Sequence, residues 1–278
     1  MANYYDAVLN QIVSRKLIPV GVTAVNQMPL ATFQYKGSKL YASIAAAAGG
    51  DLTFKADDTN GTTTVDPNIG WTTAVQTNGV IDLSTPDTTM DTIGELEAWI
   101  NASADWRMMI NGALRADSTD NRFFTLSAAQ AKVSSGLTLY QDEGITPFKL
   151  GFSITNRRFN GINSWTTDQG YQNALHYLSL HLTSTGGVTV NLYEIDDNPS
   201  SVTLQNNVTE TLLFSEVVAS ATALTEKFVL DWGGPIIASV GKRLFVEIVG
   251  AAAVSMPSPT SAASFVKALG SSTKVLSS

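Results

Sequence analysis

The stretch Leu178-Ser-Leu-His-Leu-Thr-Ser-Thr-Gly-Gly-Val-Thr-Val-Asn-Leu192 decides the fold class, because apolar and polar residues alternate on both sides of a glycine pair. Alternation with a period of two predicts β-strands that each bury one face. Ser184-Thr-Gly-Gly187 can supply the positive φ values of a hairpin loop. We therefore expect residues 178–182 and 188–192 to form antiparallel neighbours.

The same alternation recurs on either side of this stretch. Phe148, Leu150 and Phe152 alternate with polar or small residues, and further strands are expected over 211–218, 227–232 and 243–249. Several strands with one apolar face each predict two sheets packed face to face. Residues 145–250 are therefore predicted to form an antiparallel β-sandwich or jelly roll.

The N-terminal half has a mixed pattern. Thr92 and Glu95 fit a helix capping box, and Leu52 with Phe54 and residues 106–110 alternate as strands do. We expect a helix and arm over 1–50, with extended segments after residue 17, and a small α+β (ββαβ) unit with a linker over 51–144. A C-terminal arm is expected over 251–278. The predicted fold class is thus mainly β: an α+β N-terminal unit followed by a sandwich or jelly roll.

The composition excludes several classes of protein. Charged residues make up 15% of the chain, against a usual share of about 25%, and there is no cysteine. These values exclude a disordered tail, a disulfide-stapled miniprotein and a zinc ribbon. A net charge of -7 repels phosphate backbones and anionic lipids. We therefore expect no nucleic-acid partner and no membrane partner, and the first residues do not have the pattern of a signal peptide.

No residue pattern predicts catalysis. The chain has neither a nucleophile elbow nor a phosphate-binding loop. His176 and His181 are an odd number of positions apart on an expected strand, so they point to opposite faces and do not share a metal. The carboxylates available to a glycosidase are Asp168, Glu194, Asp196 and Asp231. Because nothing in the sequence fixes a catalytic separation between any two of them, we expect a non-enzymatic protein without cofactor or metal.

Two kinds of ligand remain as alternatives. Residues 57–61 and 194–198 cluster the oxygen ligands that calcium takes, but without EF-hand spacing, so turn chemistry explains them better. Trp71, Trp165 and Tyr171 lie in expected loops, where an aromatic ring can stack on a sugar, although packing in the core is the simpler explanation. The alternative function is therefore a carbohydrate-binding module that uses Trp165 and Tyr171.

Two adjacent segments carry a resemblance. They are residues 91–101, Asp-Thr-Ile-Gly-Glu-Leu-Glu-Ala-Trp-Ile-Asn, and residues 106–118, Trp-Arg-Met-Met-Ile-Asn-Gly-Ala-Leu-Arg-Ala-Asp-Ser. This helix and strand resemble those of bacteriophage structural proteins and are similar in style to a motif of flagellar hook-associated proteins. The resemblance implies a virion structural protein of a tailed bacteriophage.

The chain ends indicate where such a protein would dock. Residues 4–17 have helical spacing with one apolar stripe, which is expected to pack either in the core of its own chain or on a neighbour. The stretch from residue 251 is too apolar for a free tail. That stretch is expected to lie either on its own sandwich or on a neighbouring subunit. The residues expected to bind a partner are Tyr4, Tyr5, Leu9, Ile12, Phe265, Val266 and Leu269.

These observations lead to one functional prediction and one alternative. We expect a capsid decoration or cement protein on the capsid surface of the virion, which binds the major capsid protein and is a homo-oligomer. A trimer is the expected state on a symmetric lattice. The alternative is a carbohydrate-binding tail-fibre or adhesin module.

Overall fold

The chain forms two compact units, one inserted into the sequence of the other. The computed structural model describes residues 16–19, 29–47, 51–58, 76–77, 80–81, 83, 90–120, 122–123, 126–130, 136–140, 148–153, 158–160, 164–166, 171–180, 183–184, 186–196, 208–218, 228–229, 236–239, 242–250, 254–255 and 266–274. One unit, the jelly-roll unit, comprises residues 1–24, 146–159 and 165–278. The inserted unit comprises residues 25–145 and 160–164.

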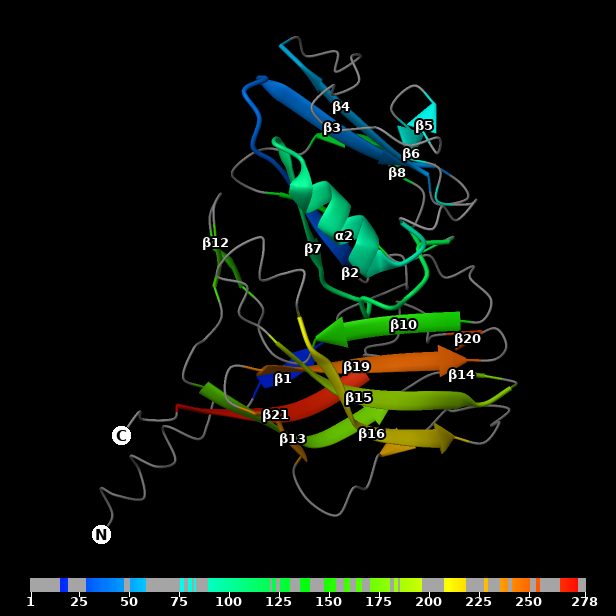
Figure 1. The fold of residues 1–278 in the computed structure, drawn as a ribbon. Helices are drawn as coiled ribbons and strands as arrows, with labels where there is room; N and C mark the ends of the chain where they lie inside the picture. Colours follow the sequence, from blue (N-terminus) through cyan, green and yellow to red (C-terminus); the bar gives the residue numbers. More distant parts are fainter. Residues whose placement is uncertain are drawn as a thin grey trace. The chain divides into compact units, whose positions relative to one another are not determined.

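The jelly-roll unit contains two main antiparallel sheets (Figure 1). The first has the order β1 (Lys16–Pro19), β21 (Val266–Lys274), β13 (Tyr171–Leu180), with β17 (Phe228–Val229) and β18 (Ile236–Ile237) both pairing along the far side of β13. The second has the order β10 (Phe148–Ser153), β19 (Lys242–Gly250), β15 (Val188–Asp196), β16 (Glu210–Val218).

The strand order identifies the architecture. We count β17 and β18 as one interrupted strand and number the eight strands of the two sheets along the chain. The strand order is then 1-8-3-6 in the first sheet and 2-7-4-5 in the second. This is the order of a jelly roll. The predicted mainly-β fold with a jelly roll is confirmed, but the jelly roll is not confined to the predicted residues 145–250, because it includes β1 and β21. Its first strand, β1, precedes the inserted unit, and its second strand, β10, follows it.

Alternation along the strands matches burial. Val188, Val190 and Leu192 of β15 are buried, whereas the residues between them are only partly buried. On the neighbouring strand β19, Val246 and Ile248 lie in register with Leu192 and Val190 and are also buried. Residues directly opposite in an antiparallel pair share one face of the sheet, so these side chains form one buried face. Strand β13 of the first sheet approaches β19 of the second.

The predicted hairpin between residues 178–182 and 188–192 is wrong. Leu178 and Leu180 belong to β13 in the first sheet, whereas β15 lies in the second. Alternation determines which face of a strand is buried, but it does not determine the neighbouring strand. Gly187 has a φ of 76°, as expected for a turn glycine, but this connection carries the chain between sheets.

The C-terminal strand lies inside the first sheet. β21 pairs with β13 through Leu180↔Val266 and with β1 through Leu17↔Leu269. Of the two positions left open for the C-terminal arm, residues 266–274 therefore take the one on their own chain. Lys16 and Leu17, expected to end a helix, begin β1; the rest of that predicted helix lies outside the described residues.

The inserted unit contains two sheets and helix α2 (Ile93–Ala102). The five-stranded sheet has the order β5 (Gln76–Thr77), β6 (Val80–Ile81), β4 (Leu52–Asp57), β3 (Tyr41–Ala46), β8 (Leu126–Gln130). The three-stranded sheet has the order β7 (Trp106–Ile110), β2 (Pro29–Tyr35), β9 (Leu137–Tyr140). Residues 29–46, expected to belong to an extended arm, thus supply two strands of this unit.

One hydrophobic core joins these elements. Phe54 and Trp106 pack edge to face with ring centroids 4.9 Å apart, and Phe33 lies 5.8 Å from Phe54. Helix α2 adds Ile93, Leu96 and Ile100, which are fully buried. The helix lies against β7 (Figure 1).

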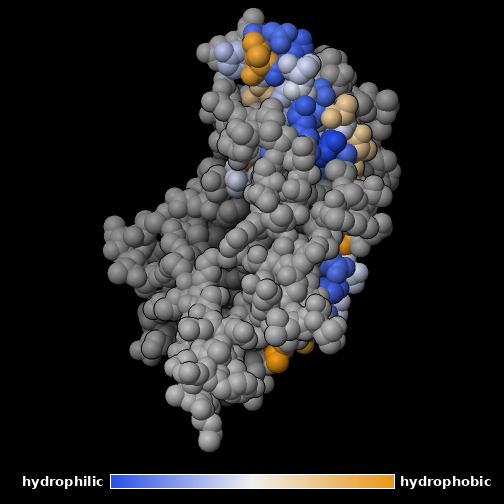
Figure 2. Space-filling view, turned by 90° about the vertical axis from the view of Figure 1, so that its left-hand side faces the viewer, coloured by the Kyte–Doolittle hydropathy of each residue, from blue (hydrophilic) through white to orange (hydrophobic). Residues whose placement is uncertain are grey.

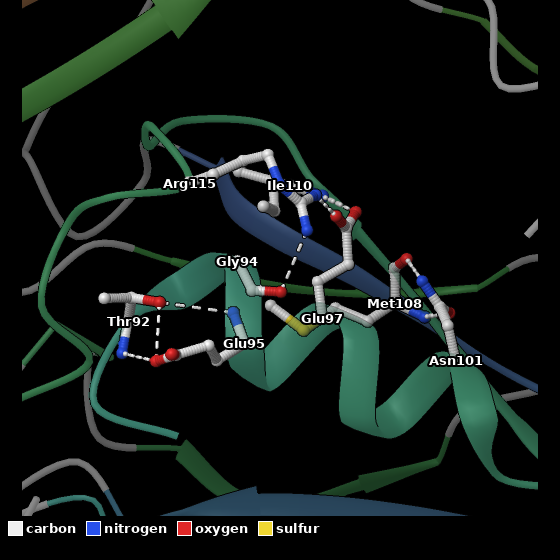
Figure 3. A network of polar contacts seen from close by, with 8 residues as sticks. All are labelled: Thr92, Gly94, Glu95, Glu97, Asn101, Met108, Ile110 and Arg115. Atoms are coloured by element: carbon white, nitrogen blue, oxygen red, sulfur yellow. Dashed lines mark hydrogen bonds and ion pairs between the residues drawn. The ribbon is translucent and has the colours of Figure 1, made fainter. Parts of the chain in front are cut away.

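The start of α2 confirms the predicted capping box (Figure 3). The Glu95 N–H donates to the Thr92 hydroxyl oxygen over 3.3 Å, and the Thr92 N–H donates to the Glu95 carboxylate over 3.1 Å. Hydrogen bonding with Asp91 and with Thr92 lowers the pKa of Glu95. Two backbone donors at the helix start are satisfied in this way.

Two short strand pairs complete the described elements. β11 (Arg158–Asn160) pairs with β12 (Ser164–Thr166), and β14 (Thr183–Ser184) pairs with β20 (Val254–Ser255).

Candidate functional site

Strand β16 exposes a row of apolar side chains at one end of the four-stranded sheet. Leu212, Leu213 and Val217 are 51%, 37% and 75% exposed. β16 pairs with β15 on one side, and no described strand pairs with its other side. A long exposed edge strand with apolar side chains is a ready template for another strand. We call residues 210–218 the β16 edge.

The register with β15 places the side chains of the β16 edge. Leu212 lies opposite Tyr193 and Val217 opposite Thr189, and these two residues of β15 are partly buried. We call the face that carries them the outer face of the sheet. Leu213 is the extra residue of a β-bulge, because the register shifts between Leu192 and Tyr193.

Glu216 belongs to the other face. It lies opposite Val190, which is fully buried, and its own side chain is half-buried. The β16 edge therefore combines exposed apolar residues on the outer face with one carboxylate beside the apolar interior.

A row of polar contacts crosses the outer face of all four strands. Lys149 Nζ lies 2.9 Å from a carboxylate oxygen of Glu247, which is 3% exposed. The Asn191 amide donates to Glu247 over 2.9 Å, and the Ser215 hydroxyl donates to Asn191 over 2.7 Å. The Tyr193 hydroxyl donates to Glu247 over 3.5 Å. The row ties β10, β19, β15 and β16 together and ends at the exposed side of the sheet.

The acidic residues at the end of β15 have local partners. Lys242 Nζ lies 2.5 Å from Asp196, and the Thr209 N–H donates to Asp196 over 2.9 Å. Burial alone would raise the pKa of Asp196, but the contacts with Lys242 and Thr209 outweigh it and lower the pKa. Glu194 accepts the Ser239 N–H over 2.9 Å. These two glycosidase candidates therefore join neighbouring segments, while Asp168 and Asp231 lie outside the described residues.

Of the calcium candidate at residues 57–61, the structure describes Asp57 and Asp58. Asp58 forms an ion pair with Lys39 over 2.8 Å, and both side chains are exposed. Residues 59–61 lie outside the described residues. In the part of the chain that the structure describes, no group of three or more histidine, aspartate or glutamate side chains is arranged to hold a metal.

Residues 91–101 and 106–118 form a buried polar clamp between α2 and β7 (Figure 3). Asn101 accepts the Met108 N–H over 2.8 Å and donates to the Met108 carbonyl oxygen over 3.1 Å. Glu97, 2% exposed, accepts the Ile110 N–H over 3.2 Å and forms an ion pair with Arg115. Arg115 also donates to the Gly94 carbonyl oxygen over 3.0 Å.

The clamp explains why polar residues stand in the helix. β7 pairs with β2 on one side, and the side chains of α2 supply hydrogen-bond partners to its backbone on the other. Covering a strand edge with a helix is one way to prevent unwanted strand pairing. These residues hold the fold together, and β16 has no such cover among the described elements.

Most of the predicted docking residues fall outside the described part of the chain. Tyr4, Tyr5, Leu9, Ile12 and Phe265 lie outside the described residues. Val266 and Leu269 lie on β21, whose backbone is paired with β13 and β1.

Of the remaining candidates, the structure describes the backbone at Trp165, Tyr171 and His176. Trp165 lies in β12, Tyr171 begins β13, and the β13 register shifts at His176. His181 and Trp71 lie outside the described residues.

The sequence predicted a strand over 211–218 but not its exposed apolar side chains. Leu212-Leu213-Phe214 is a run of three apolar residues, and consecutive residues of a strand point to opposite faces. Such a run inside a strand with one buried face requires either a bulge or an exposed apolar side chain, and the β16 edge contains both. This run was the signal available in the sequence.

In comparisons with protein-family models, curated proteins and solved structures, nothing matches this chain. Among the described residues, no helix has the length and apolar character needed to cross a membrane. On the face drawn in Figure 2, hydrophobic side chains of the described residues form small groups among hydrophilic ones. Of the five large hydrophobic side chains that are exposed among the described residues, three (Leu212, Leu213 and Val217) lie on the β16 edge.

Proposed function

We propose that this chain is a non-enzymatic structural protein of a tailed-bacteriophage virion, of the capsid decoration or cement type. The observation that carries the proposal is the β16 edge of a jelly roll, with Leu212 and Val217 exposed. Jelly rolls recur in viral capsid proteins. The resemblance of residues 91–118 to phage structural proteins supports the same assignment.

The proposed mechanism is stabilisation by assembly. Apolar side chains that are exposed on one subunit are buried when it contacts the major capsid protein or another subunit at the capsid surface. Each Å² of apolar surface removed from water contributes about 25 cal/mol. Because the contact exists only in the assembled shell, binding shifts the equilibrium toward the intact particle.

Association with capsids tests this proposal. Purified protein is mixed with heads that were assembled without it, and the bound fraction is measured by co-sedimentation and its position by electron microscopy. Val217→Lys is expected to weaken binding, whereas Leu40→Lys, at an equally exposed position in the inserted unit, is the matched control. If the parent protein does not bind heads, or if both variants behave alike, the proposed role of the β16 edge fails.

A second measurement addresses the N-terminal docking residues. Deletion of residues 2–15 removes Tyr4, Tyr5, Leu9 and Ile12 but leaves β1 in place. We expect this deletion to reduce head binding without changing the thermal unfolding of the jelly-roll unit. Unchanged head binding would contradict their docking role.

A carbohydrate-binding tail-fibre or adhesin module is the second candidate. The outer face of the four-stranded sheet presents Tyr193 next to the amide of Asn191 and the hydroxyl of Ser215. An aromatic ring beside hydrogen-bonding groups suits a sugar, and jelly rolls also form lectin domains. A glycan array separates the candidates: sugar binding that is lost in Asn191→Ala or Trp165→Ala, without head association, would favour the adhesin.

A further inference from the structure

The β16 edge has the features of a selective site for an added strand. We propose that it binds one extended segment of a partner protein as a fifth strand of the four-stranded sheet. We propose further that this segment carries lysine or arginine opposite Glu216 and apolar residues on its outer face. This inference rests on the proposed function, since the segment would belong to a neighbouring protein of the virion.

The length and composition of β16 favour strand addition. The strand has nine residues, Glu-Thr-Leu-Leu-Phe-Ser-Glu-Val-Val, with no lysine and no proline. Lysine and proline are the residues that most often protect an edge strand. In strand addition the main chain supplies hydrogen bonds, and alternate side chains supply specificity. The apolar contacts on the outer face would be made with Leu212 and Val217, which are 51% and 75% exposed.

Glu216 makes the site selective. It is half-buried on the face of the sheet that also carries fully buried Val190. A strand added at the edge would place one side chain beside it, at the Cβ separation of about 4.5–5.5 Å that cross-strand pairs have. In this partly desolvated position a cation is favoured and a second carboxylate is disfavoured. A charge that points inward on an edge strand also discourages indiscriminate pairing.

A second copy of this chain fits the edge less well. Each subunit has a net charge of -7, and each would bring its own Glu216 and Glu210 to the joint edge. The charges therefore favour a basic, apolar segment over self-pairing.

Model peptides test the inference. The probe is a nine-residue synthetic peptide of alternating threonine and valine with lysine at its centre, blocked at both ends, and the control peptide has glutamate at the centre. Binding to the full chain is measured by fluorescence anisotropy. We expect the lysine peptide to bind at least about fivefold more tightly, which corresponds to about 1 kcal/mol for the change in the cross-strand charge pair.

Variants of the full chain locate the contact. Glu216→Gln is expected to make the two peptides bind nearly equally, whereas Val217→Lys is expected to weaken both. Leu40→Lys, in the other unit, is the control and should change neither. Circular dichroism melting verifies that each variant is folded, and Leu212→Lys provides a second outer-face variant if Val217→Lys is unstable.

Three results would overturn the inference. They are the absence of peptide binding, equal binding of the lysine and glutamate peptides to the parent chain, and concentration-dependent dimerisation that Val217→Lys abolishes. The last result would identify a second copy as the occupant. The head-binding assay is independent of the peptides, so capsid association without peptide binding would refute this inference while the proposed function stands.

Discussion

Replacement of Asn101 by alanine tests the clamp between α2 and β7. The Asn101 side chain is the partner of both the N–H and the carbonyl oxygen of Met108, at 2.8 and 3.1 Å, and both residues are buried. Alanine would leave two buried backbone groups unpaired, at about 1–3 kcal/mol each. The expected loss is therefore about 2–6 kcal/mol, a large share of the roughly 5–15 kcal/mol that stabilises a typical domain.

Urea unfolding and amide hydrogen exchange measure this effect. Asn111→Ala is the matched control, because Asn111 donates only one described side-chain hydrogen bond, to Thr32 over 2.6 Å, and is half-buried. It should cost about 0.5–1.5 kcal/mol. The Met108 amide should lose protection in Asn101→Ala and keep it in the control. Equal losses of stability in the two variants would refute the reasoning.

Asn101→Asp adds a pH signature. The aspartate can still accept the Met108 N–H, but when ionised it faces the Met108 carbonyl oxygen without a proton to donate. Burial and this contact should raise its pKa in the folded state above the ordinary value of about 3.9. The variant should therefore be destabilised at pH 7 and should regain stability as the pH falls through the raised pKa. A pH-independent deficit would contradict this account.

Three further predictions concern other parts of the chain. In Gly94→Ala the added Cβ would lie 2.8 Å from the Arg115 Cβ and 2.9 Å from its carbonyl oxygen, so urea unfolding should show a loss of about 1–3 kcal/mol despite the better helix propensity of alanine. Removal of residues 265–278 takes a strand from the middle of a sheet and should abolish cooperative melting of the jelly-roll unit; a retained transition would argue against this pairing. Asp196→Asn should cost about 0.2–1 kcal/mol at pH 7, and the deficit should vanish as the pH falls through the lowered folded-state pKa of Asp196; a constant deficit would exclude the ion pair with Lys242 as its cause.

Local structure was predictable where neighbouring residues determine it. The capping box at Thr92 and Glu95 located the start of α2, and alternation located β10, β15 and β19. Both signals depend on contacts within a few residues or on which face of an element is buried. A short window of sequence therefore contains all the residues that each signal requires.

Strand partners were not predictable in the same way. Leu17 pairs with Leu269, and β2 pairs with β7 and β9 across intervening strands. No local pattern encodes such a partner, because a strand with one apolar face can join either sheet. This explains why the predicted hairpin is wrong and why the extended segments between residues 17 and 48 were not assigned to a sheet.

The candidate site was hidden for a related reason. Its apolar residues read as ordinary strand residues, and only the register with β15 separates exposed Leu212 and Val217 from Glu216 on the buried face. The bulge at Leu213 breaks the simple alternation and exchanges the faces of the residues on either side of it. The face on which each β16 side chain lies therefore follows only from the pairing of β16 with β15.

The strand order also determines which part of the jelly-roll unit can accept another strand. The backbone of β21 is paired with β13 on one side and with β1 on the other, so Val266 and Leu269 stand on a strand with no open side near Leu269. The β16 edge is different, because its apolar residues are exposed although the strand already pairs with β15. Among the described strands of the two main sheets, a partner that binds by adding a strand would therefore be expected at β16 and not beside β21 near Leu269.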